Sequence, residues 1–337
     1  MPDHGSGLTV LGMGTFPEWV EARPIEKTDV AEWAALLNDV QQADQDGENY
    51  DAEDLIEELS DPKLAADRDT VGLWVDGVMV AYGVVNWRKN LVDVDRLNTD
   101  SAVRPPWRRR GLGRALLTWM IGRARELHEE HHPDVDEAEL NAAAISTNAG
   151  AEALFTSFGF AETRYFFELK RPFDAPIPVV EVPDGLRLVP FEPAYDEPLR
   201  LVHNEVFLDH WGSTPKDEET WKVWFTGSRS FRAALTFLVL DGDRIVAYAN
   251  GFEYEADTTV TGIREVYVGQ VGTVRSHRGR GLAAVALSAL MRQAEQAGFK
   301  RASLGVDAEN PTGALGLYER LGFHQHAKSI TYRLPLT

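Results

Sequence analysis

The stretch RRRGLG at residues 108–113 recurs as RGRGLA at residues 278–283, 170 positions further along the chain. A second match follows each copy, because SFGF at residues 157–160 corresponds to RLGF at residues 320–323 at an offset of 163. The same order of segments is predicted around both copies: a hairpin, a strand, the arginine- and glycine-rich loop, a long amphipathic helix, a strand, a short helix and a last strand. The sequence therefore indicates one fold used twice.

Length and proline content indicate where the two copies meet. The chain has 337 residues, about twice the usual domain length. Three prolines fall within residues 172–178, and proline removes a backbone donor and disfavours helix before it. We therefore expect an N-terminal extension at residues 1–20, a first domain at 21–170, a proline-rich linker at 171–184 and a second domain at 185–337.

Composition excludes several classes of protein. The chain has no cysteine, which rules out disulfides, thiolate metal sites and a cysteine nucleophile. No apolar run approaches the length of about 18 residues needed to span a membrane, and the first residues do not resemble a secretory signal, so we expect a cytoplasmic protein. The formal net charge of −19 disfavours nucleic acid and anionic membranes as partners. It favours a cationic substrate such as an amine, although acidity also serves solubility.

The repeated loop has the composition of an anion site. Each copy is predicted to end a strand and begin a helix, where free amides and the positive end of the helix dipole attract anions. Glycine lets a phosphate approach the backbone, and arginine adds charged donors. Basic helix starts that contain glycine also occur for packing reasons alone, but two copies in the same context favour a diphosphate site.

These stretches resemble those of the GNAT acetyltransferases, whose Arg/Gln-x-x-Gly-x-Gly/Ala loop binds the pyrophosphate of acetyl-CoA. The resemblance covers nearly the whole chain after the first 20 residues or so, and the tandem arrangement resembles actinobacterial members of the family, including mycothiol synthases. It implies an α+β fold of two tandem three-layer domains, each with a mixed, mostly antiparallel sheet flanked by helices. It also implies that acetyl-CoA contacts Arg108, Arg109, Arg110, Gly111 and Gly113 in the first copy and Arg278, Gly279, Arg280, Gly281 and Ala283 in the second.

The two copies differ at one position that carries chemistry. The stretch NPTGALGLYERLGF at residues 310–323 closely resembles the family pattern, in which an asparagine (here Asn310) accompanies the cofactor and a tyrosine (here Tyr318) protonates the departing CoA thiolate. The equivalent of Tyr318 in the first copy is Phe155, which has no proton to give. We therefore expect catalysis in the second domain and a degenerate first domain; the alternative is that Tyr318 is a packing aromatic.

The remaining roles are assigned less narrowly. In the family a backbone N–H before the loop stabilises the oxyanion, which points to the amide of Val274 or of an adjacent residue. Glu265 is the expected general base, with Asp307 and Glu309 as rivals. The acyl acceptor is expected to contact the segment between the two early helices of the second domain, namely Asp209, His210 and Trp211, which could instead serve the core or cap a helix.

One further stretch matches a known metal-binding motif in its residues but not in its surroundings. The sequence HEEHH at residues 128–132 matches the zinc-protease pattern H-E-x-x-H, but Pro133 follows at once and the flanking residues are polar. We therefore interpret it as a solvated surface segment and expect no metal site. A metalloprotease remains the third functional hypothesis.

The favoured hypothesis is an acetyl-CoA-dependent N-acetyltransferase that acts on a primary amine of a small molecule. The alternatives are a non-catalytic protein that binds or senses acyl-CoA, and an acetyltransferase like mycothiol synthase. The acceptor itself has no recognisable signature in the sequence. We expect no nucleic-acid or membrane partner, and either a monomer whose halves form a pseudo-dimer or a homodimer.

Overall fold

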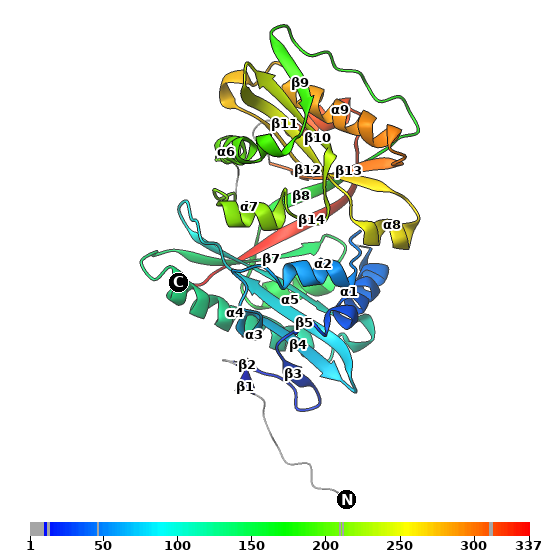
Figure 1. The fold of residues 1–337 in the computed structure, drawn as a ribbon. Helices are drawn as coiled ribbons and strands as arrows, with labels where there is room; N and C mark the ends of the chain where they lie inside the picture. The colour runs from blue at the N-terminus through cyan, green and yellow to red at the C-terminus, as the bar shows by residue number, and fades with distance from the viewer. Residues whose placement is uncertain (1–9, 12–13, 46, 209, 211, 310–312) are drawn as a thin grey trace, which may run out of the picture. The chain divides into compact units, whose positions relative to one another are not determined.

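The computed structural model describes residues 10–11, 14–45, 47–208, 210, 212–309 and 313–337. They form two compact units (Figure 1). The first unit runs to Arg164 and also includes Ser329–Thr337, and the second unit is Tyr165–Lys328.

The last strand of each copy accounts for this division. The strands are β8 (Ala161–Pro172) and β14 (His324–Pro335). Residues 166–172 of β8 pair antiparallel with residues 301–307 in the second unit, and residues 329–335 of β14 pair antiparallel with residues 139–145 in the first. The units therefore divide at residues 164 and 328, and not within the proline-rich segment 171–184 that the sequence indicated.

The segment after β8 is extended, as proline predicts, but it packs on the second unit. Residues 175–183 contain no helix or strand. Ile177 is buried in the core of this unit, and the Pro178 carbonyl accepts a hydrogen bond from Ser288. Arg171 is buried and donates to the carbonyls of Ala175 and Pro176, which holds the segment at its start.

In the first unit six strands pair side by side in the order β3-β4-β5-β6-β7-β14. Of these neighbouring pairs only β6 with β7 is parallel. A separate pair of short strands, β1 (Val10–Leu11) and β2 (Gly14–Thr15), precedes them in this unit. Its other elements are β3 (Glu21–Arg23), α1 (Val30–Asp44), α2 (Ala52–Glu58), α3 (Ala66–Asp69), β4 (Thr70–Val75), β5 (Val78–Asn86), β6 (Asp95–Val103), η1 (Pro105–Trp107), α4 (Leu112–His131), β7 (Ala138–Ile145) and α5 (Ala149–Ser157).

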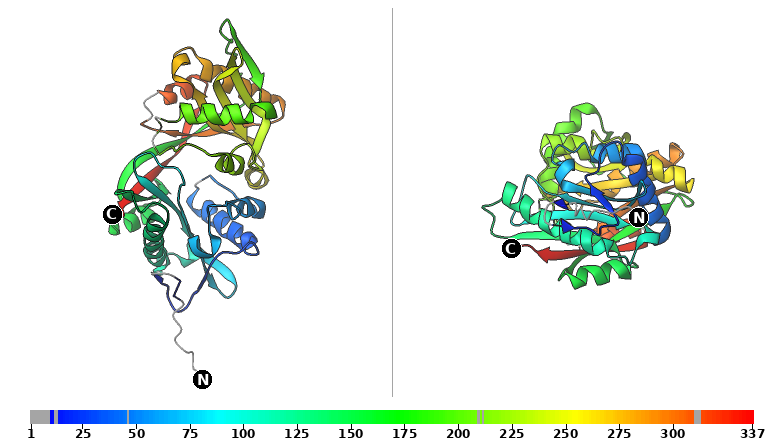
Figure 2. Two further views of the ribbon diagram at one scale, coloured as in Figure 1. Left: turned by 60° about the vertical axis from the view of Figure 1, so that its left-hand side comes forward. Right: turned by 90° about the horizontal axis from the view of Figure 1, so that it is seen from below.

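Helices cover both faces of this sheet, with α4 on one side and α1 and α2 on the other (Figure 2). The buried side of α4 includes Leu112, Leu116, Met120 and Ala124, as its apolar period predicts. Gly83 on β5 allows this helix to approach, because a Cβ atom there would lie 3.3 Å from both Leu116 and Met120.

The second unit repeats the arrangement in the order β8-β13-β12-β11-β10-β9, and again only one neighbouring pair, β12 with β13, is parallel. Its elements are β9 (Leu186–Pro190), η2 (Pro193–Tyr195), α6 (Asp196–Val206), α7 (Glu218–Trp224), β10 (Phe231–Asp241), β11 (Arg244–Phe252), α8 (Glu255–Thr261), β12 (Glu265–Thr273), η3 (Arg275–His277), α9 (Leu282–Gln296), β13 (Arg301–Asp307) and α10 (Ala314–Arg320).

The long helix α9 packs against β10, β11 and β12, and α6 packs against β11 and β12. A period of 3.6 residues predicts an apolar face of α9 at Leu282, Val285, Ala286, Ala289, Leu290 and Ala294, and all of these are buried except Ala289, which is half-buried. The α+β prediction of two similar units, each with a mixed and mostly antiparallel sheet and flanking helices, is confirmed.

Candidate active site

The loop of the second unit leads from β12 through η3 into α9. Gly279 and Gly281 have φ angles of +76° and +78°, a left-handed conformation that residues with a Cβ atom rarely adopt. Gly281 is the N-cap of α9, and no side chain caps the helix, so its first amides can receive an anion. The Arg278 Nε donates to the Thr273 carbonyl at 3.2 Å, and the described residues give its guanidinium no other partner.

The loop of the first unit follows the same path, but its arginine has a different partner. The Arg108 Nε donates to the Val103 carbonyl at 3.0 Å. Its two Nη atoms donate to the Asp44 carboxylate at 2.7 and 2.8 Å, a two-pronged ion pair. Asp44 ends α1, and its carboxylate also accepts a hydrogen bond from the Asn148 side chain at 3.2 Å. The protein's own carboxylate thus takes the guanidinium edge that would hold a phosphate.

Backbone strain also separates the two loops. Gly111 is the N-cap of α4 with a φ angle of +89°, like Gly281 at the start of α9. Arg109 has a φ angle of +64° where the second loop has Gly279, and this conformation costs a residue with a Cβ atom about 1–2 kcal/mol. Arg280, which follows Gly279, is exposed to solvent.

Other side chains of the first loop contact their own unit. The Arg110 guanidinium lies 4.8 Å from the centre of the Trp107 ring, at cation–π distance. A Cβ atom at Gly113 would lie 3.1 Å from the Leu154 side chain. The second loop has Ala283 at the corresponding position, in the first turn of α9.

The parallel strands beside the loop pair over a short distance. In the second unit, residues 265–267 of β12 pair with residues 301–303 of β13, and the pairing then ends. In the first unit, residues 95–98 of β6 pair with residues 138–141 of β7. Beyond these positions the backbone groups that face the parallel neighbour have no ladder partner among the described residues, so they can bind an extended ligand.

The structure corrects the prediction for Val274. Its amide donates to the Val246 carbonyl at 3.0 Å and is therefore not available to an oxyanion. Because residues of an antiparallel strand alternate in direction, the amides of Val271 and Thr273 point away from β11, toward β13. The bond from Arg278 to the Thr273 carbonyl lies on that side too. The amides that face away from β11 thus belong to Thr273, next to the predicted residue, and to Val271.

Tyr318 lies on α10 and is 8% exposed. Its ring packs edge-on against Phe323, with ring centres 6.0 Å apart. Burial, and the nearby hydroxyl of Tyr267, raise the pKa of Tyr318 to about 12, so its proton stays in place at neutral pH. No described residue hydrogen bonds with the Tyr318 hydroxyl. A buried phenol that keeps its proton and has no protein acceptor can give that proton to a leaving group.

Phe155 occupies the equivalent place on α5 of the first unit and is 7% exposed. Its ring centre lies 5.6 Å from that of Phe160 and 5.1 Å from that of Tyr332 on β14. The side chain is therefore a core residue that contributes no proton.

Glu265 begins β12 and is held on both oxygens. One carboxylate oxygen accepts a hydrogen bond from Arg301, and the other accepts one from Ser303. Successive side chains of a strand alternate between its faces, so Glu265 shares a face with Tyr267, whose hydroxyl neighbours Tyr318. The structure thus brings the predicted base and the predicted acid to the same region of the second unit.

The two rival carboxylates lie at the end of β13. Asp307 is buried, and its carboxylate accepts the Glu309 amide at 2.9 Å. This bond closes the turn after β13, which is a local structural role for Asp307.

The predicted acceptor segment is described in part. Asp209 and Trp211, and the predicted cofactor residue Asn310, lie outside the described residues. The amide of His210 donates to the Phe207 carbonyl at 3.0 Å, and the two rings lie 5.6 Å apart. His210 therefore follows the end of α6 closely.

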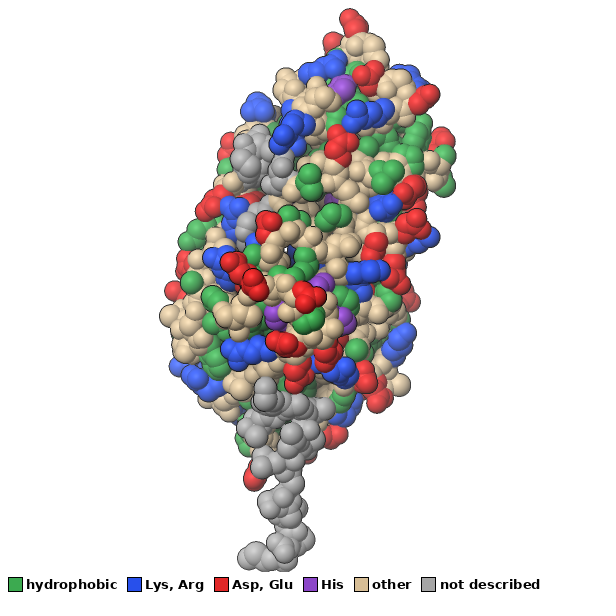
Figure 3. Space-filling view, turned by 90° about the vertical axis from the view of Figure 1, so that its left-hand side faces the viewer, with side chains coloured by type: hydrophobic (Ala, Val, Ile, Leu, Met, Phe, Trp, Pro, Cys, Tyr) green, Lys and Arg blue, Asp and Glu red, His purple; other side chains and the backbone are tan. Residues whose placement is uncertain are grey.

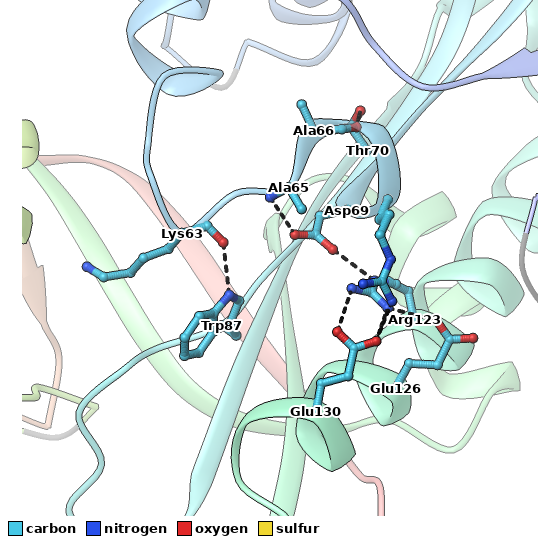
Figure 4. Close-up of polar contacts among 10 residues, drawn as sticks. Lys63, Ala65, Ala66, Asp69, Thr70, Trp87, Arg123, Glu126 and Glu130 are labelled. Carbon is cyan, nitrogen blue, oxygen red and sulfur yellow. Dashed lines mark hydrogen bonds and ion pairs between the residues drawn. The ribbon is translucent and has the colours of Figure 1, made fainter.

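The HEEHH segment is less solvated than the sequence suggested. His128 is buried, and its Nδ1 lies 2.8 Å from the Asp95 carboxylate. The His131 ring stacks on Trp87 with centres 3.5 Å apart, and the Trp87 indole donates to the Lys63 carbonyl at 2.9 Å (Figure 4).

Glu130 of this segment takes part in an ion network around buried Arg123. Its guanidinium contacts Asp69 at 2.8 Å, Glu126 at 2.8 Å and Glu130 at 3.0 Å (Figure 4). Among the described residues no group of three or more His, Asp or Glu side chains is placed to hold a metal ion. The network links α3 to α4, so the segment has a structural role.

Surface features add little to the choice of partner. No helix within the described ranges has both the length and the apolar character that crossing a membrane requires. On the face shown in Figure 3, acidic and basic side chains are interspersed.

Two features of the site escaped the sequence analysis. Asp44 has no local signal, because its partner Arg108 lies 64 positions away. The roles of the Val271 and Thr273 amides depend on which strand neighbours each side of β12, which no local pattern states.

Comparison with known proteins agrees with this geometry. The model of the acetyltransferase (GNAT) family matches residues 33–160 and again residues 197–323. The mycothiol acetyltransferase of Salinispora arenicola is 29% identical over 330 residues, which cover 95% of this chain and 98% of that protein. The mycothiol acetyltransferase of Thermomonospora curvata is 32% identical over 267 residues, 77% of this chain and 80% of its own length.

A solved structure shares the whole fold. The crystal structure of a GCN5-related N-acetyltransferase from Sphaerobacter thermophilus superposes with a TM-score of 0.77 and 25% identity, covering 96% of this chain and 97% of that one. Both matches of the family model fall on the loop, the long helix and the short helix described above. The chain therefore belongs to the GNAT family of N-acetyltransferases and contains two tandem copies of its domain.

Proposed function

We propose that the second unit transfers the acetyl group of acetyl-CoA to a primary amine of a small molecule in the cytoplasm. The observation that carries this proposal is Tyr318, a buried hydroxyl that retains its proton and has no hydrogen-bond partner among the described residues. The loop arginine of the second unit, Arg278, also has no carboxylate partner among those residues, whereas Arg108 of the first unit is paired with Asp44. Only the second unit combines the two features.

The residues present fit acetyl-CoA. The Arg278 guanidinium and the first amides of α9 would hold its diphosphate, and the amides of Val271 and Thr273 would bind the extended arm and the thioester oxygen. The first unit has the same loop, but Asp44 holds Arg108.

The transfer needs three proton movements: the nitrogen loses one proton before it attacks and a second once the carbon–nitrogen bond has formed, and the sulfur gains one. The amine must lose a proton before its nitrogen attacks the thioester carbon, and Glu265, which forms an ion pair with Arg301, is the proposed acceptor. As the carbon–sulfur bond breaks, the electron pair remains on sulfur. Tyr318 then supplies the proton that turns the thiolate into free CoA.

The names of the relatives support a narrower acceptor. Two proteins that share most of their length with this chain are mycothiol acetyltransferases. We therefore propose an amine related to mycothiol as the first acceptor to examine, with the chain acting as a monomer or a homodimer.

The test is to measure release of CoA thiol from acetyl-CoA with a panel of amines that includes a mycothiol-type amine, an aminoglycoside and peptides. We expect turnover with at least one small amine and acetylated product by mass spectrometry. Calorimetric binding of acetyl-CoA without turnover on any amine would contradict the proposal and favour the alternative, a non-catalytic acyl-CoA-binding protein.

A further inference from the structure

The ladder between β11 and β12 contains an irregularity in the second unit. Asn250 pairs with Gln270, but the next residue, Gly251, pairs with Val268, so Gly269 is an extra residue on β12. An extra residue of this kind is a β-bulge, which turns the backbone groups of the strand near it. A Cβ atom at Gly269 would lie 2.4 Å from the Phe252 ring, so the close approach requires glycine.

The Asn250 side chain holds the strand at the bulge. Its Oδ1 accepts the backbone N–H of Gln270 at 2.6 Å, and its Nδ2 donates to the Gln270 Oε1 at 2.7 Å. Asn250 is 1% exposed, so these bonds are shielded from water. A side chain therefore fixes the backbone of β12 immediately before Val271, whose amide points toward β13.

The first unit provides an internal comparison. Val80 and Val246 occupy equivalent positions. The carbonyl of each accepts a hydrogen bond from the amide that lies four residues before the loop arginine of its unit. Four residues further on, the first unit has Val84 in place of Asn250. Its strands β5 and β6 pair without a shift from Ala81 with Val103 to Asn86 with Asn98. The unit without the tyrosine thus lacks both the asparagine and the bulge.

We propose that Asn250 is a positioning residue for acetyl transfer. By holding the Gln270 amide, it sets the bulge and thereby directs the Val271 amide at the thioester carbonyl oxygen. This inference rests on the proposed function, and it assigns a task to a residue that touches neither acetyl-CoA nor the amine.

The test compares the full-length wild type with Asn250→Val, which introduces the residue of the first unit, and Asn250→Asp, which keeps an oxygen for the Gln270 amide. For Asn250→Val we expect kcat to fall about 10²-fold, the typical cost of a lost oxyanion donor, with the Kd for acetyl-CoA changed less than threefold. Asn250→Asp should recover most of kcat. Thermal unfolding of each variant shows that the second unit remains folded.

A spectroscopic readout separates positioning from stability. Infrared spectra of acetyl-CoA labelled with ¹³C at the acetyl carbonyl, bound without amine, should show the carbonyl stretch shifted to lower frequency in the wild type and in Asn250→Asp but not in Asn250→Val. An unshifted wild-type band, a shift that Asn250→Val retains, or a parallel loss of acetyl-CoA affinity would overturn the inference. If the wild type acetylates no amine, the proposed function fails, while the infrared comparison still decides the role of Asn250.

Discussion

The two copies of the fold present nearly the same loop, but they differ in what holds its arginine. In the second unit, Arg278 donates to the carbonyl of Thr273 and leaves its Nη atoms without a partner among the described residues. In the first, Arg108 makes the equivalent backbone bond and also holds the Asp44 carboxylate in a two-pronged pair. The difference teaches that two loops of similar backbone can leave their arginine in different states, one free to meet an anion and the other already paired with a carboxylate.

The aromatic residues of the two short helices differ in the same direction. Tyr318 presents a protonated hydroxyl, whereas Phe155 is closed into a cluster with Phe160 and Tyr332. Under the proposed function, each difference would remove one requirement for acetyl transfer from the first unit.

The substitution of Tyr318 by phenylalanine, the residue of the first unit, should have the largest effect on kcat. Tyr318→Phe removes the proton donor, and we expect kcat to fall about 10³-fold, or about 4 kcal/mol, because general acid catalysis typically contributes 10²–10⁴-fold. The Kd for acetyl-CoA should change less than twofold. Phe155→Tyr in the first unit is the matched control and should leave kcat unchanged, as measured by steady-state thiol release and calorimetry.

The pH profile adds a second readout for the same residue. Because the pKa of Tyr318 is raised to about 12, its proton remains bound up to about pH 10, and kcat should show no alkaline loss from this group below that pH. A Tyr318→Phe variant with the kcat of the wild type would remove the acid role.

A buried histidine should make the stability of the second unit more sensitive to acid. The His203 ring bonds the Tyr248 hydroxyl at 2.7 Å, where the first unit packs Trp33 against Tyr82. Burial lowers the pKa of His203 to about 3 from its ordinary 6.5, so the unfolded chain binds the proton first. The stabilisation is complete above pH 6.5 and is lost as the pH falls toward 3, by a few kcal/mol in total.

Denaturant unfolding at pH 7 and pH 4 measures this effect. The variant His203→Leu lacks the titrating group, and its free energy of unfolding should fall less between the two pH values than that of the wild type. The same fall in both proteins would show that other groups cause the acid sensitivity.

The loop arginines should differ in their contribution to cofactor affinity. We expect Arg278→Leu to weaken CoA binding about 30-fold, close to the 2 kcal/mol typical of a charged hydrogen bond. Arg108→Leu is the matched change in the first unit and should alter the Kd less than twofold, because its guanidinium already holds Asp44. Calorimetric titration with CoA distinguishes these outcomes. An equal loss of CoA affinity in both variants would contradict the prediction that the two loop arginines contribute differently.

The parts of this comparison that could be predicted are local. Turn chemistry predicts the glycines at the start of α4 and α9, and a 3.6-residue period predicts most of the buried positions of α9. Both signals act over a few neighbouring residues. The identity of Tyr318 and Phe155 could likewise be read directly from aligned motifs.

The parts that could not be predicted depend on pairing across the chain. The alternation of β8 and β14 marks them as strands, but nothing in either strand states which neighbour it pairs with. The sequence therefore predicts a division at the prolines and not at residues 164 and 328. The bond from the Val274 amide to the Val246 carbonyl arises from strand register with a residue 28 positions away, so the local sequence does not reveal that this amide is already occupied.

Removal of Asp44 should free the Arg108 guanidinium, which this carboxylate holds in the first loop. We expect the wild type to bind one CoA per chain in calorimetric titration and Asp44→Ala to bind two, the second at least tenfold more weakly because Arg109 still strains the loop. Asp39→Ala is the control, since Asp39 also lies on α1 and pairs with Arg104, so the variant removes the same charge without releasing Arg108. Two sites in the wild type, or one site in Asp44→Ala, would show that this carboxylate does not decide which unit holds the cofactor.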